Sequence, residues 1–215
     1  MSSISHPLMS RLDHIIFATP DLDLGIDTLE RRLGIRAKRG GQHRGHGTRN
    51  AFIGLQGDRF LEILGPDPDQ AAPKRARWLA IDTLQEPRLT GWAAKGHDLR
   101  SLVDDATPQG VNLGKVLSGK RSNKDGSVLT WSFTDPYTRL ADGIVPFFID
   151  WGDTPHPSQL AAPGAQLNDL WAEHPEPTSV QAMLRVLGLE LPVRLGPKAG
   201  LVAEITALHG RIELR

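Results

Sequence analysis

A glycine followed by an aliphatic residue recurs three times in this chain, as Gly34-Ile35, Gly110-Val111 and Gly188-Leu189. The three glycines are 76 and 78 residues apart, and each follows a short segment whose apolar residues have helical spacing. Glycine often ends a helix because it adopts the left-handed conformation without strain. Strand-like segments flank all three positions, so the repeat predicts three related units, each with a strand, a helix and further strands.

The first unit, residues 11–64, is expected to have the order βαβββ. Residues 11–18 read as a strand rich in β-branched and aromatic side chains, and Asp21 offers a helix start. The apolar stripe of the helix is formed by Leu22, Ile26, Leu29 and Leu33. A second strand is expected from Ile35 into a glycine-rich loop at residues 40–47, followed by strands at 50–55 and 60–64.

A second βαβββ unit is expected over residues 88–151, with the strand after its helix starting at Val111. A shorter βαββ unit is expected over residues 167–215, in which two or three strands follow the helix. Two linkers separate them. Residues 65–87 have prolines near both ends and a helix around Trp78, and residues 154–166 are proline-rich and irregular. The sequence therefore predicts an α+β fold made of two repeated βαβββ modules and a truncated C-terminal third module.

Composition excludes several classes of protein. The 215 residues contain no cysteine, which excludes disulfides and thiolate ligands and fits a reducing, cytoplasmic location. Twenty-five basic residues balance 25 acidic ones, and no motif of a nucleic-acid-binding fold is present, so we expect neither nucleic acid nor membrane as a partner. We also expect no secretory signal, and a monomer or homodimer that binds a small molecule.

Side-chain alternation places two ionisable residues on one face of the first module. In the strands at 11–18 and 60–64, Ile15, Phe17, Leu61 and Ile63 form one face, which suits the helix stripe. His14 and Glu62 fall together on the opposite face, each among apolar neighbours. A buried carboxylate needs a partner, which a metal ion or a histidine supplies. A structural His–Glu hydrogen bond or a solvated sheet face would explain the same pattern.

The segment from Arg31 to Arg49 contains seven arginine and lysine residues and no acidic residue. A solvated strand edge protected by charge explains this pattern, and so does attraction of an anionic small molecule. Arg44 is the preferred anion contact, because a guanidinium in the glycine-rich loop can hold a carboxylate or phosphate at two points.

Three segments of the first module resemble the vicinal oxygen chelate superfamily, which includes glyoxalase I, extradiol dioxygenases, fosfomycin-resistance enzymes and bleomycin-binding proteins. They are Leu12-Asp13-His14-Ile15, the helix entry Pro20-Asp21-Leu22, and Phe60-Leu61-Glu62-Ile63. The segment from Gly40 to Asn50 is similar to the signature of the glyoxalase-like domain branch. The resemblance implies paired modules that curl into one concave mixed sheet around a divalent metal.

Carried over residue by residue, the resemblance makes His14 and Glu62 metal ligands, and Glu62 also the proton-transferring catalytic group. The second module departs from the pattern: Gly91 falls opposite His14, and Phe147 or Phe148 opposite Glu62. None of these binds a metal, so a replacement ligand is needed. His43 is the first candidate, and the unranked alternatives are His97, Asp135, Asp150 and His156. The candidate ions are Zn, Mn, Ni or Fe.

Two functions remain open at this stage. One is a metal-dependent lyase or isomerase acting on an anionic compound with vicinal oxygens. The other is a metal-free binding or sequestering protein of the bleomycin-resistance type. For either, the expected substrate contacts are Arg44, Asn50, Trp92, Trp131 and Phe148, although the aromatic residues also fit a purely structural core.

Overall fold

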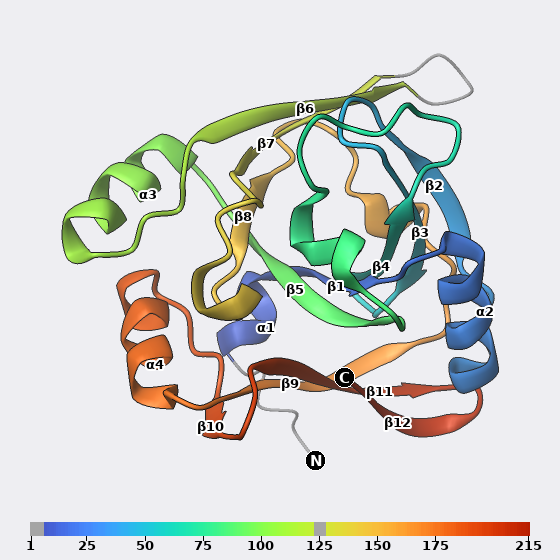
Figure 1. Cartoon of the computed structure of the whole chain (residues 1–215). Coiled ribbons are helices and arrows are strands. Elements are labelled where there is room, and N and C mark those ends of the chain that lie inside the picture. Colours follow the sequence, from blue (N-terminus) through green and yellow to red (C-terminus); the bar gives the residue numbers. More distant parts are fainter. Residues whose placement is uncertain (1–6, 123–127) are drawn as a thin grey trace.

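The computed structural model describes residues 7–122 and 128–215, and its main element is a curled eight-stranded sheet (Figure 1). The strand order is β2-β3-β4-β1-β5-β8-β7-β6. The first module contributes β1 (Leu12–Ala18), α2 (Leu22–Leu33), β2 (Lys38–His43), β3 (Thr48–Gly54) and β4 (Phe60–Pro66). The second contributes β5 (Arg88–Lys95), α3 (Leu99–Ala106), β6 (Val116–Ser122), β7 (Val128–Thr134) and β8 (Phe147–Asp150).

The strand order reads the same from either edge once β1–β4 are matched with β5–β8. In both modules the first strand pairs in parallel with the last, β1 with β4 and β5 with β8. The modules join through antiparallel pairing of β1 with β5, which places an approximate twofold axis between those strands. The repeated βαβββ architecture and the concave mixed sheet are therefore confirmed.

Helix α2 of the first module shows how the local sequence determines where an element begins and ends. The side chain of Asp21 caps its first turn by accepting a hydrogen bond from the Leu24 backbone N–H at 2.9 Å. Gly34 ends it in the left-handed conformation with φ of 73°, and its N–H bonds the Glu30 carbonyl. The predicted stripe is buried against the convex face of the sheet, where Ile15, Phe17, Leu61 and Ile63 also lie.

The C-terminal segment forms a second sheet, with β9 (Gln166–His174), α4 (Pro177–Val186), β10 (Val193–Leu195), β11 (Gly200–Ala207) and β12 (Gly210–Leu214). Three strands follow α4, which agrees with the two or three that the sequence indicates for this truncated unit. The strand order of this second sheet, β10-β9-β11-β12, differs from that of the other modules because β10 pairs in parallel with β9. The second sheet lies outside the curl of the eight-stranded sheet (Figure 1), and its apolar residues belong to the same core as those of α2.

The linker between the modules lies inside the curl of the eight-stranded sheet (Figure 1). Its 3-10 segment η1 (Trp78–Thr83) packs Trp78, Leu79 and Ile81 against concave-face residues of both modules. The remaining short helices are α1 (Pro7–Arg11), η2 (Thr107–Gln109), η3 (Leu140–Gly143) and η4 (Pro157–Gln159). The linker therefore fills part of the concavity and narrows what is left to a pocket.

Two predicted strands begin later than the sequence pattern indicated. The second strand was expected from Ile35 but starts at Lys38 and includes Gly40 and Gly41, which were assigned to a loop. The strand expected from Val111 starts at Val116. Ile35 and Val111 are instead buried core residues directly after the helix ends, so their apolar character reflects packing. No helix in the described ranges is long and apolar enough to cross a membrane.

The two faces of α2 allow a matched test of the core. Leu29 is fully buried and Leu24, on the same helix, is 42% exposed. We expect Leu29→Ala to lower the free energy of unfolding by about 2–5 kcal/mol, because it leaves a cavity against the sheet. Leu24→Ala should change it by less than about 0.5 kcal/mol. Urea denaturation measures both, and similar effects would contradict the packing described.

Candidate functional site

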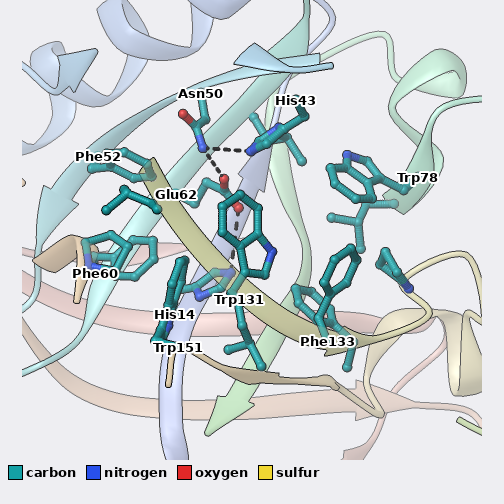
Figure 2. A pocket seen from close by; sticks show the side chains of 17 residues that line it. His14, His43, Asn50, Phe52, Phe60, Glu62, Trp78, Trp131, Phe133 and Trp151 are labelled. Atoms are coloured by element: carbon teal, nitrogen blue, oxygen red, sulfur yellow. Dashed lines mark hydrogen bonds and ion pairs between the residues drawn. The ribbon is translucent and has the colours of Figure 1, made fainter. Parts of the chain in front are cut away.

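A pocket opens on the concave face of the eight-stranded sheet, lined by 17 residues from both modules and from both linkers (Figure 2). The space between them is about 620 Å³, including the part that opens to solvent. The lining contains seven aromatic side chains besides histidine: Phe52, Phe60, Trp78, Trp131, Phe133, Phe147 and Trp151.

The polar groups of the pocket lie on one wall, which belongs to the first module (Figure 2). Asn50 on β3 donates from Nδ2 to Oε1 of Glu62 on β4 at 2.6 Å. Oε2 of Glu62 lies 3.6 Å from Nε2 of His14 on β1. Asn50 Nδ2 also lies 3.2 Å from Nε2 of His43, whose Nδ1 contacts the Thr48 hydroxyl. The wall is one connected set of polar side chains.

The glycines of β2 bring the Asn50 side chain close to the backbone. A Cβ on Gly40 would lie 2.2 Å from Asn50 Oδ1, and the Gly41 N–H donates to that oxygen at 3.0 Å. Because Oδ1 is held there, the amide NH₂ turns toward Glu62. The signature glycines were expected to form a turn. Gly45 and Gly47, with φ of 80° and 65°, do so, whereas Gly40 and Gly41 orient Asn50.

Below His14 lies a second carboxylate, Asp13, which is almost completely buried. Its Oδ1 is 2.6 Å from Nδ1 of His14, and its Oδ2 accepts from Nε1 of Trp151 and contacts Nε2 of His156, both at 3.1 Å. Burial would raise the pKa of Asp13, but hydrogen bonds with His14 and His156 outweigh burial and lower the pKa to about 2. Asp13 is therefore ionised at neutral pH.

The imidazole of His14 is fixed by ring contacts as well as by Asp13. It stacks on Phe60 with centroids 4.5 Å apart, and Phe147 meets its edge at 5.8 Å. Phe147 comes from the second module, so His14 lies where the two modules meet. An imidazole held on both sides in this way keeps Nε2 aimed at the same point near Glu62.

The mouth of the pocket lies where β2 and β6, the two edges of the curled sheet, approach each other. Arg44 and Lys120 are exposed there, beside His43, Trp78 and Trp131, which line both the mouth and the pocket. His46 stacks on Trp78 at 4.3 Å, and burial, with a smaller contribution from the charge of Arg75, lowers the pKa of His46. The cationic groups Arg44 and Lys120 are thus outside the apolar cavity, and the Glu62 carboxylate is inside it.

Most of the basic residues at 31–49 form contacts on the surface of the first module. Arg36 pairs with Asp27 and Glu30, and Arg39 pairs with Asp23. Arg44 belongs to none of the ion pairs of the described residues. The charge-protected edge therefore explains much of the stretch, and Arg44 is the member at the mouth.

The structure brings together six of the predicted site residues: His14, His43, Asn50, Glu62 and Trp131 line the pocket, and Arg44 lies at its mouth. It does not bring Trp92 and Phe148 there. Both are fully buried in the convex-side core, and Trp92 Nε1 donates to the Ile144 carbonyl. Alternation along β8 places Phe147 in the pocket and Phe148 behind the sheet, so Phe148, expected as a substrate contact, does not face the pocket and Phe147 does.

Three residues with contacts at the site were missed. Asp13 was placed by alternation on the convex face, Trp78 was treated as part of a linker helix, and His156 was only an unranked alternative ligand. The apolar residues Trp78 and Leu79 indicated a packed segment, but not that this segment lies inside the curl of the sheet. No sequence signal identified Asp13 as a partner of His14.

The second module has no counterparts of His14 and Glu62. The pairing of β1 with β5 is symmetric about Ile15 and Trp92: the pair His14–Ala93 corresponds to Gly91–Ile16, and Leu12–Ala94 to Leu89–Phe17. Gly91 therefore occupies the position of His14. The Thr19 N–H donates to the Leu64 carbonyl and the Gly96 N–H to the Ile149 carbonyl, so Ile149 corresponds to Leu64, and Phe147 to Glu62. The loss of the second ligand pair, which the sequence indicated, follows from glycine and phenylalanine at these positions.

The donor set does not fit a metal centre with three or four protein ligands. His14 Nε2 and Glu62 Oε2, 3.6 Å apart, are spaced as two ligands of one ion would be. His43, the expected third ligand, uses both ring nitrogens in contacts with Asn50 and Thr48. The part of the chain that is described contains no group of three or more His, Asp or Glu residues able to hold a metal.

The paired βαβββ modules and the one-sided polar wall define a class of protein, a small-molecule enzyme or binder of the vicinal oxygen chelate fold. A family model described as "Glyoxalase-like domain" matches residues 12–188. The chain belongs to this family, whose members often bind a divalent metal. No curated protein matches the sequence.

Several solved structures are similar to this chain at low sequence identity. A hypothetical protein from Staphylococcus aureus is 12% identical, covers 88% of this chain and 87% of its own, and has a TM-score of 0.69, which shows a shared fold and nothing beyond it. Methylmalonyl-CoA epimerase from Mycobacterium tuberculosis is 20% identical over 71% of this chain and 93% of its own, with a TM-score of 0.44. A hypothetical protein from Bacillus halodurans is 19% identical over 67% of this chain and 96% of its own, with a TM-score of 0.42.

The lowered pKa of Asp13 predicts how acid acts on the fold. A carboxyl whose pKa falls from 3.8 to about 2 on folding stabilises the native state above the unfolded value, and this contribution is lost as the pH falls from about 4 to about 2. The shift corresponds to about 2 kcal/mol. We expect Asp13→Asn to cost about this much at pH 7 and much less near pH 2, in urea denaturation. An equal loss at both pH values would contradict the assignment.

Proposed function

We propose that this protein is an enzyme that removes a proton from carbon next to a carbonyl group in a small, largely apolar substrate, with Glu62 as the base. The observation that supports it is the pair of polar atoms directed at one point in the apolar pocket. Glu62 Oε1 is occupied by Asn50, while Oε2 has no hydrogen bond within the described residues. A carboxylate oxygen without a donor, in an apolar site, is well placed to accept a proton.

His14 completes the proposed proton path. Its Nε2 is 3.6 Å from Glu62 Oε2, which is too long for a hydrogen bond and leaves both atoms facing the cavity. Glu62 would take the substrate proton and give it to His14 Nε2, and the imidazolium would return it to the substrate. The buried charge of Asp13 at Nδ1 would stabilise that imidazolium. The net change is an isomerisation, with the proton moved from one atom to another.

Asn50 would orient Glu62 in this proton path. Because Gly41 fixes Oδ1, the Asn50 amide presents NH₂ groups to Glu62 and His43 and cannot turn without losing both contacts. It would hold Glu62 in one orientation and keep Oε2 as the reactive oxygen. If a divalent ion binds, His14 and Glu62 are the residues that would hold it, and it would supply polarisation of the substrate carbonyl.

The function is tested without knowing the final product, by exchange of substrate protons in ²H₂O. We expect some members of a panel of small 2-oxo acids, hydroxyketones and diketones to lose an acidic C–H signal in ¹H NMR when the protein is added. Glu62→Gln should slow this exchange by about 10²- to 10⁴-fold, because the amide cannot accept the proton. Asp58→Asn, at an exposed carboxylate paired with Lys95, serves as the control.

Running the exchange with and without a chelator separates side-chain from metal-assisted chemistry. Exchange that persists in chelator supports the path through Glu62 and His14, and exchange that needs added Zn, Mn, Ni or Fe supports the metal-dependent alternative.

A second candidate function is sequestration of an apolar compound, favoured by the seven aromatic side chains of the lining. Compounds that bind without any exchange would support this candidate over the enzyme.

We also propose that the substrate carries a negative group that stays at the mouth. Arg44 has no ion-pair partner in the described chain and borders the route into the pocket. A guanidinium contact to a carboxylate is worth about 1.5–3 kcal/mol, or roughly tenfold to a hundredfold in affinity. We expect Arg44→Ala to weaken binding of carboxylates by this factor while the melting temperature of the free protein stays nearly unchanged.

The control for this prediction is Arg36→Ala, which removes an exposed arginine that is paired with Asp27 and Glu30. Thermal shifts with carboxylates and with their neutral amides measure the difference. If the amides stabilise the protein best and Arg44→Ala has no effect, Arg44 is only a surface charge.

A further inference from the structure

The ladder between β1 and β5 contains a bulge at Asp13. Leu12 pairs with Ala94 and His14 pairs with Ala93, so two steps along β1 correspond to one step along β5. Asp13 is the extra residue and has no partner in the register. A bulge re-aims the side chain of its extra residue and recurs beside active sites. This explains why Asp13 contacts its neighbour His14, although regular alternation would place the two on opposite faces.

The contacts of Asp13 divide its two oxygens between different partners. Oδ1 faces His14 Nδ1 at 2.6 Å, and Oδ2 faces the indole N–H of Trp151 and Nε2 of His156, each at 3.1 Å. An ionised carboxylate only accepts hydrogen bonds. All three nitrogens that face it must therefore carry a proton, and for a neutral His14 ring this leaves Nε2 without one.

We infer that Asp13 is the positioning residue of this site: from its bulge it holds the His14 proton on Nδ1 and leaves the Nε2 lone pair directed at Glu62. Asp13 itself does not line the pocket. Its part in proton transfer rests on the function proposed above, whereas the tautomer that it imposes does not. Trp151 and His156 take up the second oxygen, so the carboxylate cannot turn away from His14.

The arrangement around Asp13 predicts a specific effect of replacing it by its amide. In Asp13→Asn only one oxygen remains, and the donors from Trp151 and His156 compete for it with the single donor from His14. We expect the oxygen to face Trp151 and His156 and the NH₂ group to face His14 Nδ1. The Nδ1 atom must then accept, so the proton moves to Nε2 and the lone pair that faced Glu62 is lost.

The experiment is long-range ¹H–¹⁵N correlation NMR on ¹⁵N-labelled protein, which distinguishes protonated from unprotonated imidazole nitrogens. The chain has eight histidines, so the His14 signals are assigned by their absence in His14→Gln. At a pH where the ring is neutral, wild-type His14 should show the Nδ1–H tautomer, and Asp13→Asn should show Nε2–H. Asp150→Asn, at a carboxylate that does not touch His14, should leave the wild-type pattern.

A wild-type Nε2–H tautomer would overturn the inference, even if Asp13→Asn failed to fold. A folded Asp13→Asn protein that kept the Nδ1–H tautomer would overturn it too. Where a substrate with exchangeable C–H has been found, Asp13→Asn should slow exchange by about 10²- to 10⁴-fold with little change in ligand affinity. The expected tautomers without any exchange would uphold the positioning and reject the proposed enzyme.

Discussion

The antiparallel pairing of β1 with β5 joins the two modules, and the site depends on it. It places His14 beside Ala93, next to the axis between the modules, so that Phe60 and Phe147 from opposite halves contact one imidazole. Its bulge brings Asp13 to the same ring. Burial of so much polarity in an apolar sheet is tolerated because each carboxylate accepts a strong hydrogen bond, Asp13 from its ring partners and Glu62 from Asn50.

The convex and concave faces of the sheet contribute differently to the molecule. The convex face buries α2, α3 and the second sheet in one continuous core, which supplies most of the apolar burial. The concave face has a separate and smaller core made largely by the linker residues Trp78, Leu79 and Ile81. Because the convex core holds the sheet, the concave face can leave a pocket open next to buried charges.

The sequence predicted the parts of this fold that depend on periodicity. The stripe of α2, its Asp21 start and Gly34 end, and the shared face of His14 and Glu62 all follow from local spacing. It could not predict Asp13 as a contact of His14, because a bulge depends on the partner strand. Sequence analysis also did not explain Gly40, where a side chain would collide with the side chain of Asn50, ten residues later. Phe147 and Phe148 were ambiguous because a one-residue shift in register exchanges the two faces.

The two modules contribute different kinds of side chain to the pocket, although an approximate twofold axis relates them. The first has His14 and Glu62, while the second has Gly91 and Phe147 at the corresponding positions and contributes Trp131, Phe133 and Phe147 to the pocket. A substrate would therefore meet proton-accepting atoms on one side and flat apolar surfaces on the other. An apolar wall beside Glu62 and His14 would strengthen their electrostatic interaction with a charge that develops in the proposed reaction. Loss of the second ligand pair would thus favour the proposed proton transfer at a single polar wall over chelation by several protein ligands.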